Sequence, residues 1–111
     1  MKKATNLTEY LYKIQPVRSE LLTEGPTPEE QAIIEKHFLY LQELTEKGTV
    51  ILAGRTQNTD ATSFGIVIFQ VESEDDAMKI MMDDPAIVKG VFNSELYPYK
   101  ISLFGSYHRR K

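Results

Sequence analysis

Residues 27–48 read TPEEQAIIEKHFLYLQELTEKG and predict a long helix with well-defined ends. Thr27 is a good N-cap, Pro28 suits the first helical position, and Glu30 completes a Thr-x-x-Glu capping box. Gly48, just beyond the last turn, is a typical helix stop. Local sequence therefore specifies both ends of this helix.

The predicted helix has one apolar face, whose residues recur at helical spacing. They are Ile33, Ile34, Phe38, Leu41 and Leu44. At about 100° per residue, His37 falls close to the middle of this face. A buried imidazole without hydrogen bonds would cost on the order of 1–3 kcal/mol. His37 is therefore either a core histidine bonded to a backbone carbonyl or a buried water, or a general acid or base, because histidine titrates nearest to neutral pH.

The other elements follow from apolar runs, turn residues and caps. We expect strands at 10–15, 49–53, 64–71 and 96–104, helices at 73–83 and 85–91, and a polar connection with one helical turn at 17–26. The 49–53 segment is an uninterrupted apolar run, which is typical of a buried strand. Pro98 indicates that the last strand lies at an edge or contains a bulge.

The order strand, helix, strand, strand, helix, strand is the ferredoxin-like βαββαβ pattern of an α+β fold. Both helices then lie on one face of an antiparallel sheet. The 64–71 strand is apolar on both of its faces, so the second face of the sheet should also be covered. A second copy of the chain is the simplest cover, and we expect a homodimer whose sheets pack face to face.

Composition limits the functions that are open to the chain. Its 111 residues suit a single domain, placed at 1–111 with a structured core at about 10–104. The absence of cysteine excludes disulfides, thiolate metal sites and cysteine nucleophiles, and it fits a cytoplasmic location. With 13 basic and 16 acidic residues, we expect no binding to nucleic acid or to membranes. No metal-ligand spacing occurs either, so we expect no metal and no cofactor.

Asp84 is the second candidate for chemistry. As the residue before Pro85, it would be a good N-cap for the short helix at 85–91. Alternatively, its carboxylate could orient His37 and stabilise the charged imidazole. The periodicity of the sequence does not say whether His37 and Asp84 meet.

Four further residues are candidates for substrate binding: Arg55, Thr56, Arg18 and Tyr12. Arg55 and Thr56 follow a predicted strand, where loops commonly carry binding groups. Arg55 could hold a carboxylate or phosphate with its two-pronged guanidinium, or it could be a surface charge paired with an acidic residue. Arg18 is a weaker candidate of the same kind. Tyr12 could line a pocket or could simply pack.

An ordered set of short motifs runs through the chain. They are residues 37–44, Gly48 and Ala53-Gly54 in the first half, and residues 73–77, Asp84-Pro85, Gly90-Val91 and Pro98-Tyr99 in the second. Together they resemble the YciI-like, or YCII-related, family over roughly residues 10–104. The resemblance implies a ferredoxin-like α+β fold that dimerises as an α/β-barrel, with a histidine–aspartate pair that matches His37 and Asp84. The chain departs from the family pattern at Arg55, where many relatives have proline, and in its longer 17–26 connection.

The resemblance and the residues together favour a small cytoplasmic enzyme without a bound cofactor, of the lyase or isomerase type. A chlorinated-hydroquinone dehydrochlorinase resembles this family, and cofactor-free isomerases and monooxygenases share the wider fold. His37 would move a proton on a small anionic or aromatic substrate, Asp84 would orient His37, and Arg55 would hold the negative end of the substrate. A non-catalytic ligand-binding or accessory dimer is the second hypothesis, and a purely structural role for the pair is the third, because a fold does not fix a reaction.

Overall fold

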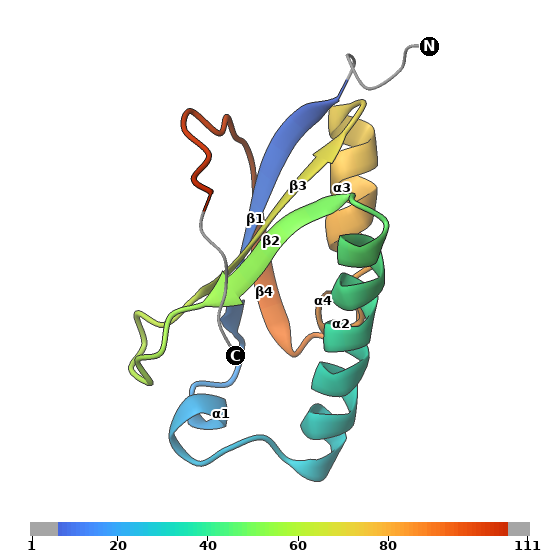
Figure 1. Cartoon of the computed structure of the whole chain (residues 1–111). Helices are drawn as coiled ribbons and strands as arrows, with labels where there is room; N and C mark the ends of the chain where they lie inside the picture. Colours follow the sequence, from blue (N-terminus) through green and yellow to red (C-terminus); the bar gives the residue numbers. More distant parts are fainter. Residues whose placement is uncertain (1–6, 107–111) are drawn as a thin grey trace.

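One antiparallel sheet with helices on one of its faces makes up the fold, in a computed structural model that describes residues 7–106. The elements in chain order are β1 (Thr8–Pro16), α1 (Glu20–Thr23), α2 (Pro28–Glu46), β2 (Val50–Arg55), β3 (Gly65–Val71), α3 (Glu74–Met82), α4 (Pro85–Val88) and β4 (Phe92–Pro98). The strand order across the sheet is β2-β3-β1-β4. The predicted ferredoxin-like βαββαβ arrangement is confirmed, with α1 and α4 as short additions (Figure 1).

Helix α2 begins and ends where its sequence predicts. The Thr27 hydroxyl accepts a hydrogen bond from the Glu30 amide at 3.1 Å, and the Glu30 carboxylate accepts one from the Thr27 amide at 2.9 Å. Gly48 follows the helix with a φ of 84°, a conformation that glycine adopts without strain. Four of the five expected apolar residues, Ile33, Ile34, Leu41 and Leu44, lie on the buried side of α2, and His37 lies with them. The expectation is wrong for Phe38, which is 63% exposed.

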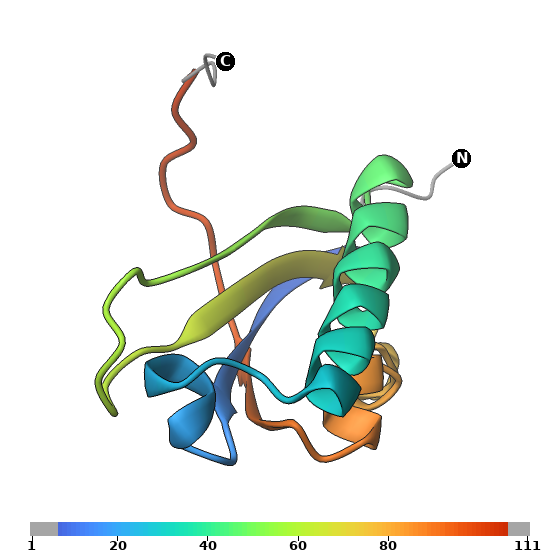
Figure 2. The ribbon, with the colours of Figure 1, turned by 90° about the horizontal axis from the view of Figure 1, so that it is seen from below.

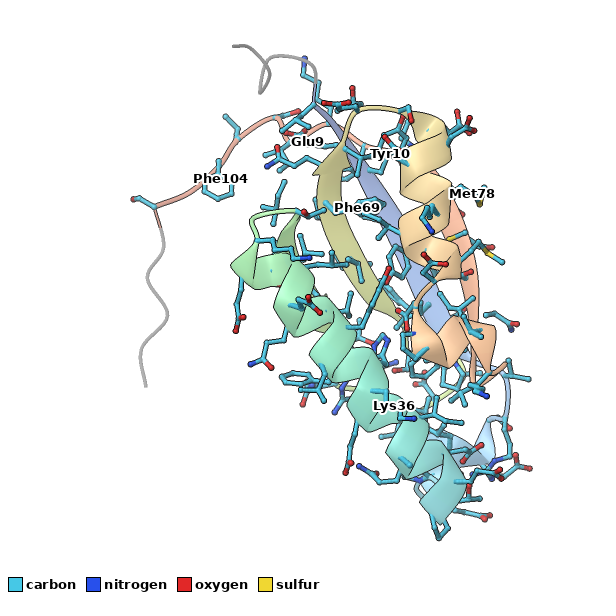
Figure 3. All side chains as sticks on the ribbon, turned by 90° about the vertical axis from the view of Figure 1, so that its right-hand side faces the viewer. Glu9, Tyr10, Lys36, Phe69, Met78 and Phe104 are labelled. Carbon is cyan, nitrogen blue, oxygen red and sulfur yellow. The ribbon has the colours of Figure 1, made fainter. Side chains whose placement is uncertain are left out.

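The main core lies between the sheet and the helices α2 and α3. Its buried members are Tyr10, Tyr12, Leu41, Val50, Val67, Phe69, Val71, Ala77 and Met81. The Phe69 ring lies between two tyrosine rings of β1, with centroid distances of 6.1 Å to Tyr10 and 5.8 Å to Tyr12. Figure 3 shows Tyr10 and Phe69 beside α3, on the side toward α2. Aromatic packing of this kind helps to fix the position of β1 relative to β3 and the helices.

The second strand differs from the expectation of a buried strand at 49–53. Strand β2 lies at one edge of the sheet, and of its residues only Val50 is fully buried, while Leu52 is 46% exposed. The expectation is wrong for the single chain because helices cover only one face of the sheet. An apolar run indicates a strand that can be covered on both faces, but it does not show that the same chain supplies both covers.

The last strand also differs from its expected position at 96–104. It spans Phe92–Pro98 and pairs with β1 from Phe92 opposite Pro16 to Pro98 opposite Tyr10. Proline has no amide hydrogen and ends the regular pairing, although β4 is the edge strand that a proline tolerates. Residues 99–106 have no regular structure and lie on the side of the sheet opposite the helices (Figures 1 and 2). The prediction that the strand extends through the apolar residues at 101–104 is therefore wrong.

None of the helices within residues 7–106 has the length and apolar character that crossing a bilayer would require.

Two neighbouring glycines test how tightly the sheet packs. A Cβ atom on Gly65 would lie 3.0 Å from Cγ1 of Ile14 and 3.3 Å from the carbonyl oxygen of Gly54, whereas a Cβ atom on Gly54 would meet open space. We expect Gly65→Val to lower the free energy of unfolding by about 1–3 kcal/mol. We expect the matched variant Gly54→Val to cause no loss, because its Cβ atom meets open space and valine is favoured over glycine in a strand. Urea unfolding followed by circular dichroism measures both, and equal losses would contradict the packing described.

Candidate active site

Asp84 is a fully buried acid at the junction of α3 and α4. It is the N-cap of α4, with the extended backbone that the following Pro85 favours, and its Oδ1 accepts a hydrogen bond from the Ala86 amide at 3.0 Å. No part of Asp84 is exposed to solvent. Burying a carboxylate is costly unless hydrogen-bond donors surround it, so Asp84 requires further donors from neighbouring elements.

Two side chains complete the donor set of Asp84. The hydroxyl of Tyr12, from β1, donates to Oδ2 at 2.7 Å. Nδ1 of His37, from α2, lies 2.7 Å from Oδ1 and 2.9 Å from Oδ2. Together with the Ala86 amide, three separate elements therefore donate hydrogen bonds to one carboxylate. Both oxygens of the buried carboxylate therefore have hydrogen-bond partners, as buried polar groups in proteins usually do.

His37 is held in one orientation, with one ring nitrogen left over. A carboxylate can only accept hydrogen bonds, so Nδ1 carries the hydrogen and Nε2 presents a lone pair. Within residues 7–106, no hydrogen bond involves Nε2. The imidazole packs edge-on against Phe92, with ring centroids 5.3 Å apart, and 13% of the side chain is exposed. The free nitrogen of an oriented histidine is the group that can accept a proton.

The tyrosines beside the pair remain hydroxyl donors. Burial, and then the negative charge of Asp84, raise the pKa of Tyr12 far above its ordinary value. Burial, followed by the charges of Asp83 and Asp84, also raises the pKa of Tyr40, whose hydroxyl donates to the carbonyl of Ile80 at 2.7 Å. Neither hydroxyl ionises near neutral pH, so the negative charge of the site is confined to carboxylates.

A histidine that donates from Nδ1 to a buried aspartate has the geometry of a general acid–base pair. The aspartate fixes the tautomer and stabilises the imidazolium that forms when Nε2 takes up a proton. Within residues 7–106, no three His, Asp or Glu side chains cluster closely enough to hold a metal ion. The contact with Asp84 leaves Nε2 of His37 as the position at which a proton could be transferred.

The model of the YCII-related domain family matches residues 9–100. The chain belongs to the YCII-related family. Among solved structures, it is similar to 5-chloro-2-hydroxyhydroquinone dehydrochlorinase from Burkholderia phenoliruptrix in complex with 2,5-dihydroxybenzoquinone. The TM-score is 0.58 at 20% sequence identity, and the match covers 82% of this chain and 93% of that chain. At this identity the likeness establishes the fold alone. Comparison with curated proteins finds no match to the sequence.

The fold brings together the two principal candidates of this YCII-related domain. The prediction that Asp84 caps α4 is confirmed, and the same carboxylate also contacts His37, which its predicted orienting role requires. Tyr12 has a different position from the one expected of a substrate-binding residue: none of it is exposed, and its hydroxyl is bonded to Asp84. Sequence reasoning missed Phe92, because it lies four positions before the predicted strand at 96–104 and no motif marks it as a neighbour of His37.

Arg18 forms an ion pair with Glu30. Its guanidinium donates to both carboxylate oxygens of Glu30, at 2.7 and 3.0 Å, and to the carbonyl of Gly25 at 3.2 Å. The two side chains are 35% and 17% exposed. The hydrogen bond from Arg18 is the main cause that lowers the pKa of Glu30 to about 2. Arg18 thus ties the connection between β1 and α2 to the first turn of α2.

Arg55 and Thr56 lie at the β2–β3 hairpin. The Thr56 hydroxyl is used within the hairpin, because it accepts from the Phe64 amide at 3.0 Å and lies 3.3 Å from the Ser63 hydroxyl. Arg55 is exposed at the end of β2 and, within residues 7–106, has no acidic partner at ion-pair distance. The alternative of a paired surface charge therefore finds no partner in the described part of the chain.

Removal of the Tyr12 hydroxyl tests the donor set of Asp84. We expect Tyr12→Phe to lower the free energy of unfolding by about 1–3 kcal/mol, because a buried carboxylate loses a hydrogen bond that no water can replace. Tyr10 is a matched control: it is 8% exposed, and its hydroxyl makes no hydrogen bond within residues 7–106. Tyr10→Phe should change stability by less than about 0.5 kcal/mol. Equal effects in thermal unfolding would count against the proposed donor role.

The Arg18–Glu30 pair makes stability depend on acid pH. The pKa of Glu30 falls from 4.5 to about 2 on folding, so its carboxylate stabilises the fold above pH 4.5 and this contribution is lost as the pH falls toward 2. We expect the wild type to be more stable than Glu30→Gln near neutral pH, with the difference closing between these two values. Urea unfolding over this pH range measures it, with Glu29→Gln as the control. A difference that stays constant with pH would contradict the ion pair.

Proposed function

We propose that this YCII-related domain is a small cytoplasmic enzyme of the lyase or isomerase type, which uses His37 to move a proton on a small substrate. The observation that carries the proposal is the contact of His37 Nδ1 with both oxygens of the buried Asp84, at 2.7 and 2.9 Å. Capping α4 requires only one carboxylate oxygen and no burial. A buried aspartate that orients a histidine through Nδ1 is typical of a catalytic acid–base pair.

The proposed chemistry uses His37 first as a base and then as an acid. Nε2 takes a proton from a ring hydroxyl group, which leaves a phenolate, or from a carbon beside a carbonyl, which leaves an enolate. In both cases the bonding electrons remain on the substrate. Return of the proton to a different atom gives an isomerisation. Departure of a leaving group with its bonding electrons gives an elimination, and the proton then leaves with solvent. Positioned acid–base groups contribute about 10²–10⁴-fold to such rates.

The proposed substrate class is a small hydroxylated aromatic or quinoid ring. The support is the similar dehydrochlorinase, whose structure contains 2,5-dihydroxybenzoquinone. Rings of this kind ionise readily and carry negative oxygens. We assign their binding to Arg55, which is exposed and has no acidic partner within residues 7–106. A guanidinium can hold two such oxygens with parallel hydrogen bonds. No resident cofactor enters the proposed reaction.

We also propose that the protein is a homodimer in which the helix-free faces of two sheets meet. The support is the apolar character of this face. By register, an apolar band of Leu11, Leu52, Ile66, Ile68 and Tyr97 crosses this face, and Lys13 and Glu95 lie beside the band on the same face. Leu52 and Tyr97 are each 46% exposed in the single chain. An exposed apolar band bordered by charged residues is typical of a protein–protein contact, and self-association through one shared surface gives a two-fold dimer.

Substitution of His37 tests the proposed reaction. The assay supplies 5-chloro-2-hydroxyhydroquinone and its chlorine-free counterpart, and it follows chloride release and the incorporation of deuterium into ring C–H positions. We expect His37→Gln to lower either rate at least about 100-fold, because an amide can still donate to Asp84 but cannot take up a proton. Lys36→Gln, on the exposed side of α2, should keep the wild-type rate (Figure 3).

Three outcomes would contradict the proposal in different ways. A rate that His37→Gln does not change would remove His37 from the reaction. Binding of 2,5-dihydroxybenzoquinone without any turnover by the wild type would favour a non-catalytic binding protein. If the wild type neither binds this quinone nor turns over either ring, the proposed substrate class is wrong. Circular dichroism of each variant confirms that it is folded.

A further inference from the structure

An exposed segment with several apolar residues follows β4 on the helix-free side of the sheet. We define residues 99–106 as the C-terminal arm. Two hydrogen bonds tether it to the start of β1, from the Tyr99 amide to the carbonyl of Glu9 at 3.0 Å and from the Ile101 amide to the Glu9 carboxylate at 2.8 Å. Beyond this tether, Leu103 is 92% exposed and Phe104 is 75% exposed. Figure 3 shows Phe104 away from the body of the fold.

A groove lies on the same side of the sheet but at its other end. It has a volume of about 330 Å³ and is lined by Leu52, Gly54, Arg55, Thr56, Phe64 and Ile66. Most of these residues are apolar, and none belongs to the arm. Because Leu103 and Phe104 remain exposed, the groove is not filled by the arm of its own chain.

The far end of the groove is out of reach of the arm in the same chain. The arm is tethered at Glu9, which pairs with Gln70 of β3. Phe64 lies six residues before Gln70, immediately ahead of β3. At about 3.3 Å per residue, this separation is about 20 Å. The three residue steps from Ile101 to Phe104 span at most about 11 Å of backbone. Within residues 7–106, Leu103 and Phe104 of the same chain therefore do not fill this end of the groove.

A second copy of the chain supplies such residues by symmetry. When two helix-free faces meet about a two-fold axis that lies between them and is perpendicular to the strands, the strand directions are reversed. The tether end of one sheet then lies over the groove end of the other. Two-fold symmetry makes this contact twice, so both arms and both grooves are used together.

We infer that the C-terminal arms are exchanged between two copies, with Leu103 and Phe104 of each chain seated in the groove of the other. The inference rests on the proposed homodimer and adds to it the residues that close the contact. It accounts both for two large apolar side chains left in solvent and for an apolar groove that the same chain leaves empty.

Cross-linking tests the exchange directly, because the chain contains no cysteine. Ser102→Cys and Gly54→Cys are made in separate chains, mixed, allowed to exchange subunits and oxidised; a Cβ atom at Gly54 meets open space. We expect a disulfide-linked dimer from the mixture and little from either variant alone. Replacing Gly54→Cys by Lys89→Cys, which is exposed on the helix side, should abolish the link. Equal linking with Lys89→Cys would overturn the exchange.

The affinity of the dimer gives a second test. We expect the double variant Leu103→Ser with Phe104→Ser to raise the dimer dissociation constant at least about tenfold, because each dimer loses four buried apolar side chains. The matched control is Phe38→Ser with Leu39→Ser, an adjacent pair on α2 that is 63% and 59% exposed. It should leave the constant unchanged in sedimentation velocity.

The outcomes separate the arm from the dimer and from the active site. If the wild type sediments as a monomer at micromolar concentration, the homodimer and the exchange both fail. If the wild type is a dimer whose dissociation constant is the same in the arm variant, the exchange fails and the homodimer stands. Turnover by wild type and by His37→Gln is read independently of either result, because no arm residue contacts His37 or Asp84 within residues 7–106.

Discussion

The burial of the Asp84 carboxylate is the constraint on which the helix layer and the site depend. A carboxylate with no exposed surface must have donors at short range, and here they come from β1, α2 and α4. Three elements that are far apart in the chain are therefore held in a fixed relation by one side chain. The same bonds leave His37 with one fixed orientation. The same carboxylate thus caps α4 and contacts His37, so the helix layer and the candidate site depend on one acid.

The two faces of the sheet have different tasks. Helices cover one face, where the aromatic rings of β1 and β3 build the core and the His37–Asp84 pair lies above them. The other face has an apolar band, carries the arm, and has no helix over it within residues 7–106. Arg55, which we propose holds the substrate, also lines the groove on this helix-free face. A partner in the groove would therefore lie beside Arg55.

The parts of the fold that sequence predicts well are those with local physical causes. The capping box of Thr27 and Glu30, and the glycine after α2, depend only on residues within a few positions of each other. The predictions for Phe38 and β2 were wrong about which side chains are covered, and the prediction for β4 was wrong about which residues pair with β1. A run of apolar residues has the same appearance whether a helix, a second chain or solvent lies beside it. Pro98 showed where regular pairing could not continue, and the apolar residues after it belong to the arm.

The sequence by itself determined the long helix, the position of His37 on its apolar face and the capping role of Asp84, because periodicity and caps act over a few residues. Only the tertiary structure decided that His37 and Asp84, 47 residues apart, share a hydrogen bond, and that Tyr12, 72 residues from Asp84, completes the donor set. Such contacts depend on strand register and on the height at which helices pack over the sheet. These are properties of the whole fold, since each strand position is fixed by its neighbours rather than by its own residues.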